Sequence, residues 1–247
     1  MKFAFSPRGP SKVKAASLEP KAKFEVRRTE AFREVSASAE YVPGSKDASR
    51  SGIFYVPIPD VSHYNKYADE ALFLHEAIPG HHYQLSLQQE NMQLPEFLHP
   101  ESLGVFVEGW ALYAESLGDE LGLYQDPVQY FGMLSMEMHR AIRLVVDTGI
   151  HGKGWTREQA IQYSLDLEAE SEAAIISEIE RYMATPGQAL SYKIGQLKIQ
   201  ELRSKATRIL GDKFNIKEFH DQVLNTGSLP LVILEKKINN WINTQGI

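Results

Sequence analysis

The segment HEAIPGHH, residues 75–82, constrains the fold of this chain more than any other stretch. The apolar residues 71–74 lie directly before it, which is typical of a helix that enters a buried region. In a regular helix Pro79 would clash with the carbonyl of His75, four residues earlier, and Gly80 tolerates the distorted backbone that follows. The helix that carries His75 is therefore expected to be distorted before the later histidines.

Two imidazoles beside a carboxylate are the minimum set of side chains for a hydrolytic zinc site. In the common HExxH pattern the two histidines lie ~40° apart on one helix face and reach the same ion. Pro79 occupies that second position here, but a bulge of two residues would return His81 to it. We predict His75 and His81 as metal ligands, with His82 as the substitute.

The competing interpretation is a surface helix that carries three histidines and a glutamate by chance. The apolar run before His75 argues against it, because an unpaired imidazole and carboxylate are costly in a buried environment. A purely structural histidine cluster nevertheless remains one alternative.

A zinc enzyme of this type needs a third protein ligand. Glu108 follows His81 after enough residues to end one helix and return along a second, antiparallel helix. Glu115 lies seven residues later on the same helix face, where it can accept a hydrogen bond from the far nitrogen of a ligating histidine. Both glutamates can also be read as solvated helix charges, and His99 and Glu101 are weaker competitors for the metal.

Three blocks of the sequence, HEAIPGHH, EGWALYAE and PGQALSYKIG, resemble the signature blocks of a bacterial family known as domain of unknown function 885. That family is similar in its site to HExxH metallopeptidases of the gluzincin type, such as the carboxypeptidase Taq family, whose motif reads HE, one residue, then GH. Matching this GH to Gly80 and His81 leaves a two-residue insertion and supports His81 over His82 as ligand. The resemblance also supports the spacing of Glu108 and Glu115.

The resemblance further implies that Tyr192, in the block YKIG, stabilises the developing oxyanion, although an ordinary core tyrosine is an equal alternative. The related peptidases place a histidine shortly before this tyrosine, and residues 183–191 contain none. His151 is the candidate replacement. With Arg143 and Asp147 it is expected to form a cluster that binds a peptide carboxylate or braces the metal ligands, unless these are plain helix charges.

The function implied by the resemblance is zinc-dependent peptide hydrolysis, with one zinc ion held by His75, His81 and Glu108. Glu76 is expected to act as the base toward water and then as the acid toward the leaving amine. The alternatives are a metal-dependent esterase or amidase for small molecules, and a catalytically degenerate domain that binds peptide or a partner.

The expected fold is mainly α with a small β-sheet (α+β), a zincin-like helical catalytic domain in residues 23–247 that follows an exposed arm, residues 1–22. The sheet is expected in residues 23–60 and the helical body in residues 64–245. Family resemblance makes this the C-terminal half of a longer architecture. Strands are predicted at 24–28, 35–42 and 52–58, and helices at 64–90, 101–122, 127–149, 156–165, 167–184, 187–211, 215–225 and 229–244.

Composition limits the partners. The formal net charge of −6 argues against nucleic acid, and no apolar run approaches the ~20 residues that span a bilayer. Cysteine is absent, which leaves histidine and carboxylate as metal donors. The expected partner is a peptide, held by strand addition along the edge strand 52–58. The location is expected to be cytoplasmic if the chain is complete and exported or periplasmic if it is a fragment; the oligomeric state stays open.

Overall fold

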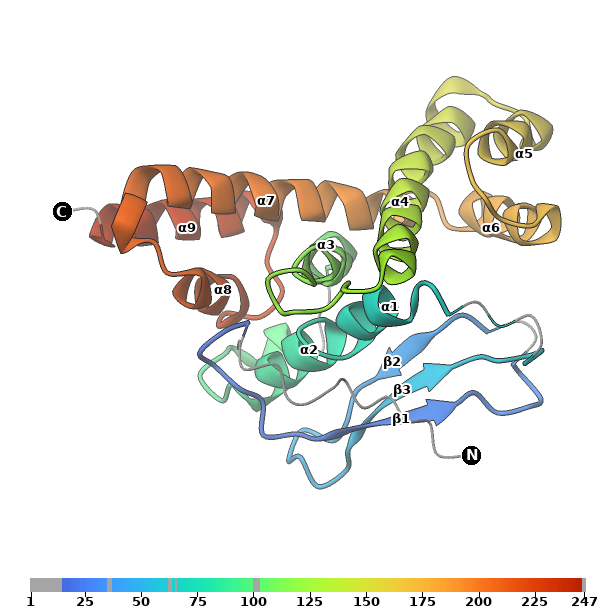
Figure 1. Ribbon diagram of the computed structural model, residues 1–247. Coiled ribbons are helices and arrows are strands. Elements are labelled where there is room, and N and C mark those ends of the chain that lie inside the picture. Colours follow the sequence, from blue (N-terminus) through green and yellow to red (C-terminus); the bar gives the residue numbers. More distant parts are fainter. Residues whose placement is uncertain (1–14, 35–36, 62–63, 65, 100–102, 246–247) are drawn as a thin grey trace.

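A computed structural model describes residues 15–34, 37–61, 64, 66–99 and 103–245. The chain is mainly helical with one three-stranded sheet, which confirms the predicted fold class. The sheet lies along one side of the first two helices, and the later helices cover the other side (Figure 1).

The sheet contains β1 (Phe24–Arg28), β2 (Glu40–Val42) and β3 (Gly52–Val56) in the order β1-β3-β2. The second strand is shorter than predicted, and residues 35–36 of its predicted span lie outside the described residues. β3 pairs in parallel with β1 and antiparallel with β2. The expectation that residues 52–58 form a free edge for substrate is therefore wrong, because both sides of β3 are already hydrogen-bonded.

The inner face of the sheet packs against the helices. Phe54 and Val56 alternate with half-buried residues along β3 and pack with Tyr41, from β2. The same cluster includes Ala77, at the end of the first helix. The sheet thus fixes the position of the break in HEAIPGHH.

Nine α-helices and three short 3-10 turns make up the rest of the described chain. The predicted helix 64–90 is two helices, and each other predicted helix overlaps one observed helix. Two of them are shorter than predicted: the helix predicted at 101–122 ends at Glu115, and the one predicted at 167–184 begins at Glu172. The helices are α1 (Asp69–Glu76), α2 (His81–Glu90), α3 (Gly104–Glu115), α4 (Pro127–Lys153), α5 (Arg157–Leu165), α6 (Glu172–Ala184), α7 (Ser191–Leu210), α8 (Ile216–Leu224) and α9 (Leu231–Gln245).

Local sequence explains where several helices begin. Asp126 accepts a hydrogen bond from Val128 N at the start of α4, with Pro127 in the first position. Thr156 and Gln159 form the reciprocal capping box at the start of α5. No helix of the described chain is both long and apolar enough to cross a membrane.

Helices α3 and α7 touch through their backbones. A Cβ atom on Gly109 would lie 2.4 Å from Gly195 Cα, and one on Gly195 would lie 1.9 Å from the carbonyl oxygen of Val105. Only glycine allows this approach, which places the EGW and YKIG blocks side by side. The buried Trp110 and Ile199 belong to the large core cluster around this contact.

The described part of the predicted exposed arm, residues 15–22, is not exposed as a whole. Ala16 is buried, and the amides of Ser17 and Leu18 donate to Asp221 Oδ1, each at 3.0 Å. Glu90, at the end of α2, likewise accepts hydrogen bonds from backbone amides of the same segment. Residues 1–14 lie outside the described residues.

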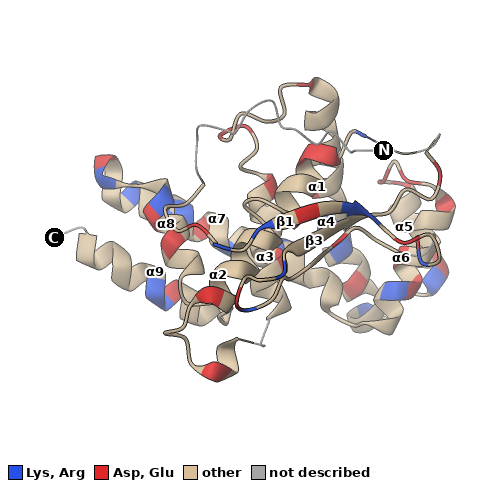
Figure 2. Cartoon of the chain, turned by 90° about the horizontal axis from the view of Figure 1, so that it is seen from below, with Lys and Arg blue, Asp and Glu red and all other residues tan. Residues whose placement is uncertain are grey.

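Basic and acidic residues are interspersed along the helices. In Figure 2 blue and red segments of the ribbon lie close together in α7 to α9 and in α5 to α6. Nucleic-acid binding usually requires basic residues that are concentrated on one face.

Candidate metal centre

The break in HEAIPGHH brings two histidines together. α1 ends at Glu76 and α2 begins at His81. The ring centroids of His75 and His81 lie 4.8 Å apart, and the two ring planes make an angle of 87°. A Cβ atom on Gly80 would lie 1.8 Å from His75 O, so the close approach requires glycine. The predicted two-residue bulge is therefore a complete interruption between two helices, with the same effect on His81.

The interruption is held by the neighbouring helix α3. Trp110 Nε1 donates a 2.7 Å hydrogen bond to the carbonyl oxygen of Pro79, and both groups are buried. This bond satisfies a backbone acceptor that the helix break leaves without a helical partner.

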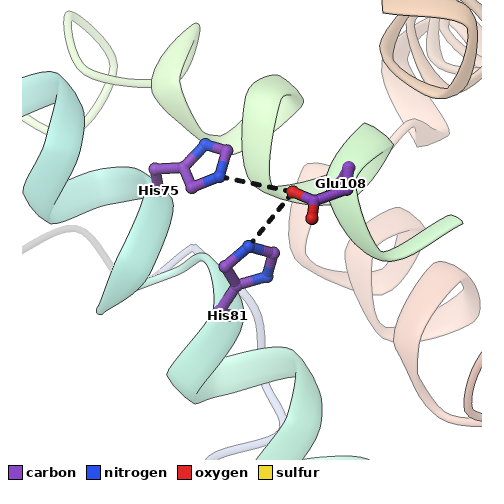
Figure 3. A group of neighbouring side chains, drawn as sticks. All are labelled: His75, His81 and Glu108. Carbon is purple, nitrogen blue, oxygen red and sulfur yellow. Dashed lines mark ion pairs between the residues drawn. The ribbon is translucent and has the colours of Figure 1, made fainter. Parts of the chain in front are cut away.

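Glu108 on α3 completes a three-residue group with the two histidines (Figure 3). Its Oε2 lies 3.5 Å from His75 Nε2 and 3.3 Å from His81 Nε2, and the three ligand atoms all lie within 4.8 Å of one another. Ligands bound tetrahedrally to zinc at ~2.0–2.1 Å stand ~3.3 Å apart, so the observed separations fit a metal ion.

The donor chemistry of the group also fits a divalent cation. Glu108 Oε2 is buried and has no hydrogen-bond partner among the described residues, although two imidazole nitrogens face it. Two nitrogens and one carboxylate oxygen are the donor set of gluzincin-type zinc sites. In the described part of the chain, this is the one group of three such residues that meets at a single point.

Glu115 contacts the ring nitrogen of His75 that faces away from Glu108. Its Oε1 lies 2.7 Å from His75 Nδ1, and both side chains are almost completely buried. Tyr124 donates to the backbone oxygen of Glu115 at 2.8 Å. The carboxylate can hold the His75 ring with Nε2 directed at the group, which is the arrangement that the sequence spacing predicts for Glu115.

The electrostatics of the group favour positive charge at its centre. Burial alone would lower the pKa of His75, but the facing carboxylates of Glu108 and Glu115 outweigh it and raise the pKa to about 10. Burial would raise the pKa of Glu108, and His75 and His81 instead hold it well below its usual range. A bound cation would supply the charge that a proton otherwise provides.

Glu76 lies beside the group with its carboxylate free. It is buried, and its Oε2 has no hydrogen-bond partner within the described residues. Burial raises the pKa of Glu76, against the opposing effect of His75 and His81. A buried carboxyl group with a raised pKa and a free oxygen is suited to accept and return a proton.

Tyr192 lies in the first turn of α7, next to the group. Its ring stacks on His75 with centroids 6.1 Å apart and an angle of 18°. The guanidinium carbons of Arg140 and Arg143 lie 5.6 and 4.9 Å from the same ring. The ring of Tyr192 is thus a neighbour of both the His75 imidazole and two guanidinium groups.

His82 points away from the group, toward the sheet. Its Nδ1 lies 2.8 Å from the hydroxyl of Tyr41, and its ring is 4.7 Å from that of Phe24. Burial lowers the pKa of His82 to about 4. Neighbouring helical positions point ~100° apart, so the structure brings His81 to the group and leaves His82 in the core.

The expected cluster of Arg143, Asp147 and His151 does not form, because the side chains bond to other residues instead of to one another. Arg143 Nε donates to Tyr182 Oη at 2.8 Å, and Asp147 accepts from the amide of Gly187 at 3.0 Å. His151 Nε2 lies 3.0 Å from the backbone oxygen of Tyr182. Among the three, Arg143 alone contacts Tyr192, so the predicted shared carboxylate site is wrong.

Two weaker ligand candidates are not found in the site, and one neighbouring residue was not predicted. His99 is not part of the three-residue group, and Glu101 lies outside the described residues. Sequence reasoning gave no role to Arg140, which is buried beside Tyr192. The available signal was its position three residues before Arg143 on the same face of a helix.

Several solved structures resemble this chain, among them the following two. A putative lipoprotein from Colwellia psychrerythraea is 41% identical, with a TM-score of 0.90 over 93% of this chain and 40% of its own. A putative lipoprotein of unknown function from Shewanella oneidensis is 28% identical, with a TM-score of 0.75 over 90% of this chain and 41% of its own. The chain thus spans about two fifths of each relative.

No functionally curated protein matches the chain. One family model covers residues 10–238, which include the three sequence blocks and every residue of the metal group. The model is described as a bacterial protein of unknown function, DUF885. The protein is therefore a member of the bacterial DUF885 family.

Proposed function

We propose that this protein is a zinc-dependent metallopeptidase with a zincin-like catalytic domain of the gluzincin type. The observation that carries the proposal is the convergence of His75, His81 and Glu108 within 4.8 Å beside the unpartnered carboxylate of Glu76. A metal-binding group without an adjacent free base would support binding alone. The combination supports hydrolysis.

Each side chain has a role in this proposal. A zinc ion bound by His75, His81 and Glu108 would lower the pKa of water and polarise the carbonyl of the scissile bond. Glu76 accepts the proton of the attacking water and delivers it to the leaving amine nitrogen. Tyr192 donates a hydrogen bond from its phenol to the carbonyl oxygen as negative charge develops there.

We also propose export from the cytoplasm. The supporting observation is that both structural relatives are described as putative lipoproteins. Because this chain spans about two fifths of each, the remaining part of such a protein is expected to contribute further walls to the substrate cleft.

The first experiment measures metal content by elemental analysis on untagged protein. About one zinc per chain is expected, lost in His75→Gln, His81→Gln and Glu108→Gln. The matched control is His82→Gln, which replaces an equally buried neighbour outside the group and should retain the metal. Protein that neither contains zinc nor takes it up would contradict the proposal.

The second experiment tests the reaction with a mixed peptide library and mass spectrometry. Cleavage is expected in wild type and a loss of ~10²–10⁴-fold in kcat in Glu76→Gln, which keeps the metal ligands. Hydrolysis of small esters or amides without peptide cleavage would assign the alternative metal-dependent esterase or amidase. Zinc binding without either activity would leave a peptide-binding domain.

A further inference from the structure

The two histidines of the metal group differ in what their second ring nitrogen contacts. His75 Nδ1 lies 2.7 Å from Glu115 Oε1. His81 Nδ1 is also buried, but it has no hydrogen-bond partner among the described residues. A histidine that binds a metal through Nε2 carries its proton on Nδ1, and this N–H group usually donates to a fixed acceptor. The second histidine therefore needs an acceptor besides the residues of the metal group.

A buried glutamine lies one helical turn after His81. Gln84 is 2% exposed, and both its Oε1 and its Nε2 are without a hydrogen-bond partner in the described part of the chain. Side chains three residues apart on a helix are neighbours on its surface. A buried polar group without a partner lowers stability, so the imidazole and the amide both gain if they meet.

A glutamine that reaches back to the residue three positions earlier occurs elsewhere in this chain. At the start of α5, Gln159 Oε1 accepts a hydrogen bond from the backbone amide of Thr156, at 2.9 Å. His81 is the first residue of α2, so Gln84 lies in the first turn of its helix, as Gln159 does. The side chain of Gln84 is therefore long enough to reach His81.

The next glutamine on the same face of α2 has partners at both ends. Gln88 Nε2 donates to the backbone oxygen of Leu98, and its Oε1 accepts from the amide of Ser228. It is 3% exposed, so it is as buried as Gln84. Gln88 thus ties α2 to two other segments of the chain, whereas Gln84 makes no such bond to the described residues.

We propose that Gln84 is a positioning residue for the metal, whose Oε1 accepts the hydrogen bond from His81 Nδ1 and so fixes the ring with Nε2 directed at the ion. The inference rests on the proposed function, because it gives His81 the support that Glu115 gives His75. The two supports differ in charge. A neutral amide orients the imidazole without adding negative charge, which leaves the ion more able to polarise a bound group.

The test compares zinc affinity in Gln84→Met and Gln88→Met, measured by competition with a chromophoric chelator. Methionine keeps the length of the side chain and removes both polar atoms. Gln84→Met should bind zinc ~10–100-fold more weakly, because one ligand loses its support, whereas Gln88→Met should bind zinc as tightly as wild type. Unchanged affinity in Gln84→Met, or an equal loss in both variants, would overturn the proposal.

Chemical denaturation of the metal-free proteins should give the opposite order. Gln88→Met leaves the oxygen of Leu98 and the amide of Ser228 unpaired, so its free energy of unfolding should fall. Gln84→Met breaks no hydrogen bond to a described residue, so its free energy of unfolding should equal or exceed that of wild type. A marked loss of stability in Gln84→Met would assign the amide a structural role instead.

Two further measurements identify the atoms. In zinc-loaded protein with isotope-labelled histidine, nuclear magnetic resonance should show faster exchange of the His81 Nδ1 proton with water in Gln84→Met, and no change for His75. Gln84→Glu keeps an acceptor at the same place and adds negative charge, so it should bind zinc at least as tightly as wild type. An unchanged His81 proton, or weak zinc binding by Gln84→Glu, would contradict the assignment.

The proposed function and this inference can fail separately. Wild-type protein that binds zinc but cleaves no peptide would contradict the peptidase function and leave the assignment of Gln84 intact, because these measurements do not use activity. Zinc-binding wild type together with full zinc affinity in Gln84→Met would contradict the assignment alone. Wild-type protein that takes up no zinc would contradict both.

Discussion

Two histidines in this protein, one buried and one half-buried, are each flanked by two glutamates, and their surroundings differ in one respect. His75 has Glu115 at Nδ1 and Glu108 at Nε2, at 2.7 and 3.5 Å. His139, on α4, has Glu168 at Nδ1 and another glutamate at Nε2. The residue pattern is the same at both places.

The two histidines differ in the glutamate that faces Nε2. Glu178, which lies 3.7 Å from His139 Nε2, accepts hydrogen bonds from Arg143, Arg181 and Tyr182. Burial would raise its pKa, but His139 together with these three partners holds the pKa far below the usual range. Glu108 faces only a second histidine. A metal site is thus recognised by donor atoms that the protein leaves unsatisfied, more than by its residue types.

The largest expected effect comes from Gly80→Ala, which should leave His75 without His81 as a neighbour and so make it resemble His139. The new Cβ cannot lie 1.8 Å from His75 O, so α2 must shift and carry His81 away from the group. We expect zinc to be lost and the free energy of unfolding to fall by ~1–3 kcal/mol. Metal analysis with chemical denaturation checks this, and a variant with full zinc content would contradict the assigned geometry.

A matched pair of substitutions sharpens the comparison. Glu115→Gln weakens the support of a metal-binding histidine and should reduce zinc affinity by ~10–100-fold. Glu168→Gln makes the same chemical change beside His139 and should leave zinc affinity unchanged. Competition with a chromophoric chelator measures both values, and similar losses in the two variants would show that the regions are not distinct.

The smallest effect concerns a histidine that is fully satisfied. The pKa of His82 falls from 6.5 to about 4 in the folded protein, so the unfolded chain binds more protons between these values. The contribution of His82 to the free energy of unfolding should therefore be fully present above pH ~6.5 and should decline as the pH falls toward 4. Thermal melts of the metal-free protein should show a shallower decline in His82→Gln. An identical pH profile would exclude this contribution.

The sequence predicts the centre of the site well because its determinants are local. Pro79 and Gly80 enforce the break by their own covalent structure, and the seven-residue spacing of Glu108 and Glu115 follows from helical periodicity. These residues meet in the structure as expected. Their catalytic roles remain predictions.

The errors concern partners that are distant in the chain. β3 is the central strand because it pairs directly with β1, although β2 lies between them in the sequence. Local sequence patterns do not contain this strand order. Arg143 and His151 are occupied by Tyr182, which belongs to α6 and is more than 30 residues away in sequence. Arg140 forms no ion pair with the described residues, and this is likewise visible only once the neighbouring side chains have been placed.

The glycine contact between α3 and α7 has a consequence for how this site can vary. Glu108 and Tyr192 are each within three residues of Gly109 or Gly195, so main-chain contact sets the distance between metal ligand and phenol. Side chains elsewhere in the α3–α7 interface can then be exchanged for others of similar volume without displacing either group. The relative position of Glu108 and Tyr192 is thus independent of the side chains that fill the rest of the interface.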